Sequence, residues 1–140
     1  MTSNATTAQV QHLNPRGLHA NPAYTQAIAV TGPVRTIYIG GQNAVDADGQ
    51  IVGDDIAAQT RQVLRNLEVA LSGAGASWEH LIKLTMFLVQ GQPLPPGFEV
   101  WQQVWGQRPN PPLITAAIVS GLAHPQFLLE IEAVAVVPQP

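Results

Sequence analysis

The sequence has no cysteine and few charged residues, and each shortage excludes a class of protein. Without cysteine there are no disulfides, no thiolate nucleophiles and no cysteine-based metal sites. Charged residues make up 11% of the chain, whereas about 25% is typical of soluble domains. So few charges leave apolar surface that further copies of the chain would cover. The composition therefore predicts a homo-oligomer.

Positive charge is especially scarce. The net charge is −3, and the six basic residues are scattered at Arg16, Arg35, Arg61, Arg65, Lys83 and Arg108. Because no basic stripe is present to neutralise phosphates, we expect no nucleic-acid partner. No signal peptide and no apolar run of membrane-spanning length are visible, so we expect a cytoplasmic protein with no membrane partner.

The chain's 140 residues, 46% of them apolar, suit one domain with its own core. Residues 1–20 are expected to form a loose N-terminal segment and residues 21–140 a single domain. The segment is polar up to about Gln9, and His12 to Pro22 is interpreted as a loop because it contains Asn-Pro turn signals.

Hydrophobic periodicity predicts an α+β fold. An amphipathic helix is expected from a cap at Asp54 or Asp55 to Gly73 or Gly75. A shorter helix is expected over 98–105, where Phe98, Trp101 and Trp105 form an aromatic stripe interpreted as core or interface. The predicted strands are 26–31, 35–40, 81–89, 114–120 and 127–137.

Two helices cover only one face of such a sheet. The segments 114–119 and 127–137 are nevertheless apolar on both faces, so the uncovered face needs a partner. Because the chain contains no further elements, a second copy is the natural candidate.

Glu130 and Glu132 stand out as candidate functional acids. Strand alternation puts both on one face, and no Lys or Arg follows Arg108 in the sequence. Two interpretations remain: an exposed face of an edge strand, or a carboxylate that lines a cleft and there holds a water or acts as an acid or base.

Gly40-Gly41-Gln42-Asn43 ends a predicted strand, either as a bulge or turn or as a place where a ligand approaches the backbone. Tyr24 in the preceding loop either packs or covers a pocket. The four histidines, His12, His19, His80 and His124, lack metal-ligand spacing, so each is interpreted as a surface residue and no metal is expected. No nucleophile elbow, P-loop or dinucleotide fingerprint is present.

Several motifs occur together in a characteristic order. They are Tyr24-Thr25-Gln26-Ala27, Gly40-Gly41-Gln42, the helical run 55–67, Ala74-Gly75-Ala76-Ser77, Pro111-Pro112, Gly121-Leu122 and Glu130-Ile131-Glu132-Ala133. As a set they resemble the RidA/YjgF family of reactive-intermediate deaminases over residues 21–137.

The resemblance implies a chorismate-mutase-like α+β fold, with a mixed sheet and two helices on one face. It also implies a homotrimer with a small-molecule cleft at each subunit interface. Members hydrolyse enamines and imines without metal or cofactor. Glu130 matches the residue that positions the attacking water, and Tyr24 and Gly41 match cleft positions, with Gln42 beside them as a further ligand-binding candidate.

The chain departs from the family at its carboxylate-binding arginine. Alignment on Pro111-Pro112 and Gly121-Leu122 puts Ile114 at that position, and Phe98 lies near the position of the family's usual asparagine. Arg108, six residues earlier, is the candidate replacement cation.

Three functions follow from the resemblance. The first is hydrolysis of an enamine, imine or related metabolite, with Glu130 positioning water. The second is a non-catalytic trimer that binds a small ligand, because Ile114 replaces the arginine. The third is the ribonuclease activity long attached to the family's name, which the scarcity of basic residues disfavours.

Overall fold

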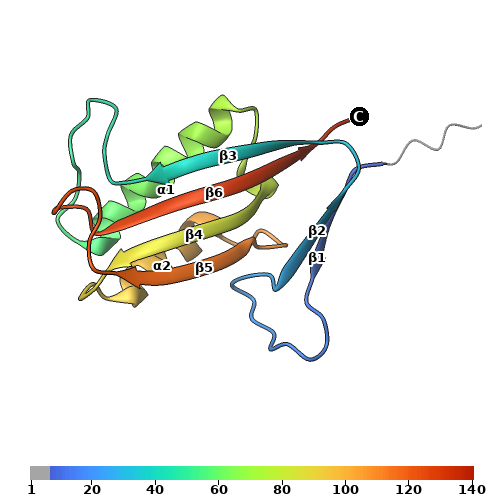
Figure 1. Cartoon of the computed structure of the whole chain (residues 1–140), viewed down its shortest axis with the longest axis horizontal. Coiled ribbons are helices and arrows are strands. Elements are labelled where there is room, and N and C mark those ends of the chain that lie inside the picture. Colours follow the sequence, from blue (N-terminus) through green and yellow to red (C-terminus); the bar gives the residue numbers. More distant parts are fainter. Residues whose placement is uncertain (1–6) are drawn as a thin grey trace, which may run out of the picture.

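The computed structural model describes residues 7–140, in which two helices pack on one face of a four-stranded mixed sheet (Figure 1). The strand order is β3-β6-β4-β5, with β4 and β5 parallel and the other neighbours antiparallel. The elements are β1 Gln9–Leu13, β2 Ala27–Thr31, β3 Val34–Gln42, α1 Ile56–Gly73, the short 3-10 helix η1 Trp78–His80, β4 Leu81–Val89, α2 Leu94–Trp105, β5 Leu113–Val119 and β6 Leu129–Pro138. The predicted α+β class is confirmed.

The longer helix, α1, forms where its apolar spacing predicts. The Asp55 side chain accepts a hydrogen bond from the Ala58 backbone N–H at 2.8 Å, which satisfies one of the free N–H groups of the first turn. Val63, Leu64 and Leu67 are at most 1% exposed, so the apolar stripe is fully buried against the sheet.

The helix-facing side of the sheet and the aromatic stripe of α2 complete the core. Leu84 of β4 and Ile131 of β6 are buried there. Trp101 stacks on Trp105 with ring centroids 5.5 Å apart and meets Trp78 edge to face at 5.9 Å. The stripe therefore belongs to the core.

Helix α2 begins at Leu94, four residues before the predicted start at Phe98. Pro95 and Pro96, a residue type that disfavours the interior of a helix, lie in its first turn. Proline is nevertheless tolerated in the first turn, because the N–H that it lacks would have no partner within the helix.

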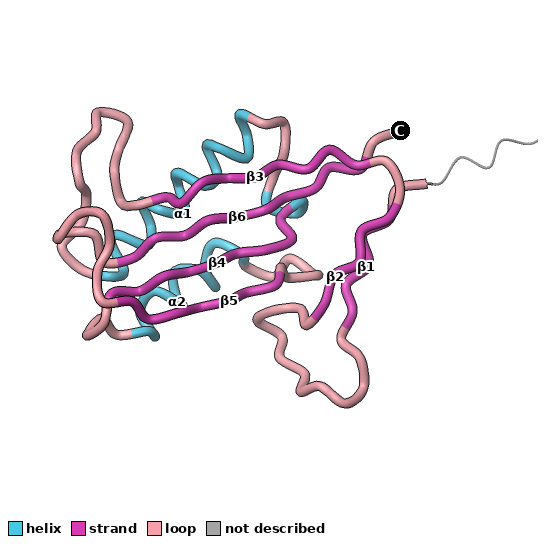
Figure 2. Tube along the Cα trace, viewed as in Figure 1, coloured by secondary structure: helices cyan, strands magenta, loops and turns pink. Residues whose placement is uncertain are grey.

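Part of the N-terminal segment also differs from the prediction. Residues 9–13, expected to be tail and loop, form β1, which pairs antiparallel with β2. This ribbon extends away from the four-stranded sheet (Figure 2). Its regularity comes from backbone hydrogen bonds to β2, which the polar composition does not reveal. Residues 1–6 of the expected loose segment lie outside the described residues.

Candidate functional site

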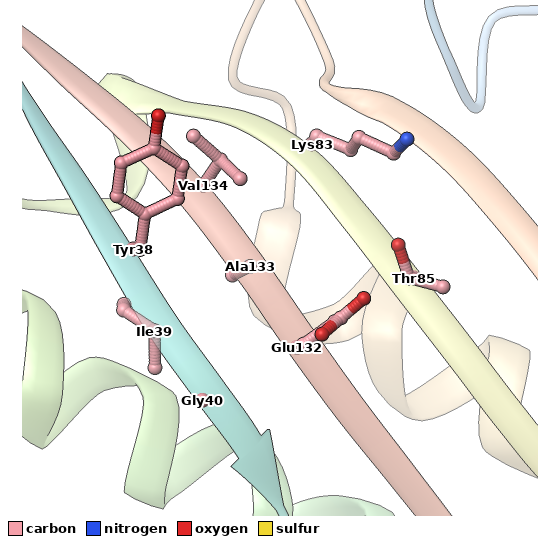
Figure 3. A pocket seen from close by; sticks show the side chains of 8 residues that line it. All are labelled: Tyr38, Ile39, Gly40, Lys83, Thr85, Glu132, Ala133 and Val134. Atoms are coloured by element: carbon pink, nitrogen blue, oxygen red, sulfur yellow. The ribbon is translucent and has the colours of Figure 1, made fainter.

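The face of the sheet opposite the helices, which we call the open face, carries polar side chains from three strands. Tyr38, Lys83, Thr85, Glu132 and Val134 lie around a shallow hollow of about 300 Å³ (Figure 3). Tyr38 is 80% exposed. No helix in residues 7–140 covers this face (Figure 1).

Glu130 and Glu132 do not lie on an edge strand, so the first interpretation of these acids is wrong in that respect. Their strand, β6, runs between β3 and β4 in the middle of the sheet. Glu132 is exposed, and Glu130, paired with Phe87 of β4, is half-buried.

Gly41 lies directly against the Glu130 side chain. The pairing register of β3 and β6 shifts between Ile39 and Gln42, which confirms the bulge at the glycine pair. A Cβ atom added to Gly41 would lie 2.7 Å from Cδ of Glu130 and closer still to its Oε2. Only glycine leaves room for the carboxylate at this place.

Amide side chains hold the loop around Gly41 in place. Gln42 Nε2 donates to the Gly40 carbonyl at 3.0 Å, and Asn43 Nδ2 donates to the Leu129 carbonyl at 3.2 Å. Asn66 Nδ2 of α1 donates to the Asn43 carbonyl at 3.0 Å. Beside this loop is an open hollow of about 540 Å³, lined in part by Gly41, Gln42, Asn43 and Asn66.

No cation neutralises Glu130 within residues 7–140, where the one ion pair joins Arg108 to Glu79. A half-buried carboxylate without a cationic partner is free to accept hydrogen bonds from a water or a ligand. It is therefore suited to orient a water or to take up a proton.

Tyr24 lies at a different place from Glu130. The next residue, Thr25, donates from its backbone N–H to the Pro112 carbonyl at 3.2 Å and from its hydroxyl to the Pro111 carbonyl at 2.5 Å. These bonds hold Tyr24 near the start of β5, whereas Glu130 is near the start of β6, at the opposite end of the sheet (Figure 1).

Ile114 begins a mostly apolar region on the helix-facing side of β5. It pairs with Leu84 and packs against the core. Ala116, two residues further on, lines a cavity of about 30 Å³ together with Phe98 and Trp101. The two positions at which the chain departs from the family pattern are thus both set among apolar neighbours.

Arg108 lies at the C-terminal end of α2. Its Nη1 donates to the carbonyls of Val104 and Trp105 at 2.9 and 3.0 Å, and its Nε lies 3.3 Å from Oε1 of Glu79. Hydrogen bonds from the Ser77 hydroxyl, from the Glu79 backbone and from Arg108 lower the pKa of Glu79 to about 2. No contact within residues 7–140 joins this guanidinium to Glu130 or Tyr24.

His19 is a surface residue, as interpreted from the sequence, but its contact with Tyr24 was not predicted. The side chain is exposed, but its Nε2 lies 2.6 Å from the Tyr24 hydroxyl oxygen. The two residues are five apart in a loop with two Asn-Pro turns, and that spacing is the only signal that pointed to the contact.

The fold and the paired Gly41 and Glu130 define a class of protein, and comparisons with known proteins identify its family. The chain has the α+β, chorismate-mutase-like fold of the Rid proteins. A family model described as Endoribonuclease L-PSP matches residues 14–137. The chain therefore belongs to the RidA/YjgF family.

Known proteins match most of this chain. A RutC family protein of Pyrococcus horikoshii is 37% identical over 113 residues, which cover 80% of this chain and 85% of the relative. The 2-iminobutanoate/2-iminopropanoate deaminase of Homo sapiens is 33% identical, with 81% and 79% covered. A Rid family protein of unknown function from Yersinia pestis has a TM-score of 0.80 and 30% identity, with 91% and 98% covered.

None of the helices in residues 7–140 has the length and apolar character needed to cross a membrane. In the same residues, His, Asp and Glu side chains form no group of three that could hold a metal ion.

Proposed function

We propose that this protein is a homotrimer that hydrolyses an enamine, an imine or a related small metabolite at clefts between its subunits. Glu130 positions the attacking water, which adds to the imine carbon. Collapse of that adduct releases ammonia and leaves a carbonyl product.

The observation that carries this proposal is the contact between Gly41 and Glu130. A half-buried carboxylate on a central strand has no cationic partner in residues 7–140, and a glycine bulge leaves room for it. The hydrogen-bonded loop fixes the distance between them, as catalysis by positioning requires. The deaminase relative from Homo sapiens supports the reaction class.

The distance between Tyr24 and Glu130 along the sheet of one protomer supports a cleft between subunits. Tyr24 and Glu130 match cleft positions of the family, yet they lie at opposite ends of one protomer's sheet. A complete cleft therefore needs the Tyr24 end of one copy beside the Glu130 end of the next. Burial of the open face, with its exposed Tyr38, would hold the copies together.

The environment of Ile114 bears on the substrate. The family's arginine holds a substrate carboxylate there, whereas Ile114 packs among apolar side chains. Placing a carboxylate against such a surface without a partner is costly. We therefore infer a substrate in which an uncharged group replaces the carboxylate.

The apolar setting of Ile114 and Phe98 also supports an alternative, a trimer that binds a small ligand without turning it over. Such a protein would keep the cleft but lose the orientation of the substrate on which the rate depends.

Ammonia release separates these proposals. The substrates are freshly generated 2-aminoacrylate and 2-aminoprop-2-enamide, in which an uncharged carboxamide replaces the carboxylate. We expect wild-type turnover of the carboxamide to exceed that of 2-aminoacrylate, and Ile114→Arg to improve use of 2-aminoacrylate by about 10-fold or more, because it restores a charge-assisted hydrogen bond. Binding of both compounds with no ammonia release by the wild type would favour the alternative.

The trimer has a direct test in solution. Light scattering is expected to give three times the chain mass of 14.9 kDa. Tyr38→Glu places a charge on the open face and should shift the protein toward monomer, because the desolvation of a charged side chain on association costs free energy. Gln103→Glu is the matched control, since Gln103 is exposed on α2, on the other side of the sheet. A monomeric wild type would refute the trimer.

A further inference from the structure

The loop that precedes β2 brings an imidazole to the hydroxyl of Tyr24. Nε2 of His19 lies 2.6 Å from the Tyr24 oxygen, a short hydrogen bond between two side chains. The rings meet edge to face, with centroids 6.0 Å apart and an interplanar angle of 79°. His19 is exposed and Tyr24 half-buried, so the pair lies at the surface where a ligand can reach it.

The backbone on both sides of this pair is held by side-chain amides. Gln26 Nε2 donates to the His19 carbonyl at 2.9 Å, and the Gln26 backbone N–H donates to Asn14 Oδ1 at 3.1 Å. The backbone N–H of Ala23 donates to Asn21 Oδ1 at 2.8 Å. The His19 imidazole thus extends from an ordered loop, whose hydrogen bonds hold the ring beside the Tyr24 hydroxyl.

We propose that His19 is a positioning residue that orients the hydroxyl proton of Tyr24 toward the bound ligand. A phenol hydroxyl has one proton to donate and lone pairs that accept. When the Nε2–H of His19 donates to the Tyr24 oxygen, the tyrosine proton is left for another acceptor. The ligand group at Tyr24 is then an oxygen acceptor, such as a carboxamide carbonyl. This inference rests on the proposed function, which places Tyr24 in the cleft.

The arrangement compensates in part for the apolar character of the cleft at Ile114. A substrate with an uncharged carbonyl in place of a carboxylate has no need of a guanidinium, but its oxygen gives up hydrogen bonds to bulk water on binding and needs a protein donor in their place. Tyr24, oriented by His19, supplies one such donor from the loop joined to Pro111 and Pro112 just before β5.

Two substitutions of His19 separate hydrogen bonding from packing. His19→Phe keeps an aromatic ring and the edge-to-face contact but has no donor. His19→Gln loses the ring but keeps an amide donor. Tyr24→Phe removes the hydroxyl itself, and the double variant His19→Phe/Tyr24→Phe closes a double-mutant cycle. The readouts are KM and kcat for 2-aminoprop-2-enamide and the affinity for its hydrolysis product, pyruvamide.

We expect His19→Phe to raise KM and weaken pyruvamide binding by about 3- to 10-fold, the effect of one neutral hydrogen bond. His19→Gln should recover most of this loss. In the Tyr24→Phe background, His19→Phe should cause no further change, because the imidazole acts through the hydroxyl.

Equal effects of His19→Phe with and without the Tyr24 hydroxyl would overturn the inference, as would a loss in His19→Gln as large as in His19→Phe. An active wild type with an unaffected His19→Phe overturns this inference alone. Hydrolysis of 2-aminoacrylate alone, without binding of pyruvamide, overturns this inference but not the hydrolytic function. A wild type that hydrolyses neither enamine and does not bind pyruvamide overturns the proposed function, and the inference with it.

Discussion

Glu130→Gln is expected to lower ammonia release by about 10²- to 10⁴-fold, the usual contribution of a positioned acid or base. Glutamine keeps the size of the side chain, and therefore its fit against Gly41, but it cannot take up a proton from the attacking water. The melting temperature should change little, because Glu130 has no ion-pair partner in residues 7–140 whose loss would destabilise the fold. Initial rates with 2-aminoprop-2-enamide, read beside a thermal melt, provide the measurement.

Glu132→Gln is the matched control for this substitution. It makes the same chemical change on the same strand and the same face, but at an exposed position away from Gly41. Its turnover should stay within a few-fold of wild type. If the two variants lose activity equally, Glu130 has no special role in the reaction.

Gly41→Ala tests the same site by changing the residue that lies against the Glu130 carboxylate. The new methyl group would overlap the end of the Glu130 side chain, which is flexible enough to move away. The fold should therefore persist while the carboxylate is displaced, and turnover should fall although Glu130 is still present. Retention of full activity in Gly41→Ala would mean that the precise place of the carboxylate is unimportant.

Trp101→Ala is expected to reduce the free energy of unfolding by about 3–5 kcal/mol, the range for truncation of a large aromatic in a core. Trp101 is 2% exposed and contacts both Trp78 and Trp105. Its removal would enlarge the small apolar cavity beside it, so the lost contacts would not be replaced. Urea denaturation of wild type and variant at one protein concentration measures the difference.

The control for that loss is Gln102→Ala. Gln102 is the next residue of α2 but is exposed, so its truncation should change stability by less than about 0.5 kcal/mol. A small effect of Trp101→Ala would show that α2 contributes little to the stability of the core.

Sequence periodicity predicted the helices and the central strands because burial on one face leaves a regular pattern. Strand β4 has the predicted bounds, and α1 begins at one of the two predicted caps. Strand β1 and the first turn of α2 were missed, because a polar ribbon and a proline-rich turn are held by backbone geometry rather than by apolar spacing.

The candidate site, like the fold, was predicted from the sequence only in part. Motif order along the chain identified Glu130, Gly41 and Tyr24 as candidates and marked Ile114 as the position that departs from the family. Residue order says nothing, however, about which of them are in contact. The structure brings Gly41 against Glu130, 89 positions later in the chain, through the pairing of β3 with β6.

By itself, then, the sequence determined the fold class, the core-facing stripes and the scarcity of charge, since local propensity and burial act along the chain. Only the tertiary structure showed that Gly41 leaves room for the Glu130 carboxylate. It also showed that Arg108 donates to carbonyls at the end of α2 and that His19 contacts Tyr24. The first depends on the pairing of β3 with β6, and the other two are short-range contacts fixed by the shape of a helix end and of a loop. None of the three leaves a periodic signal in the sequence.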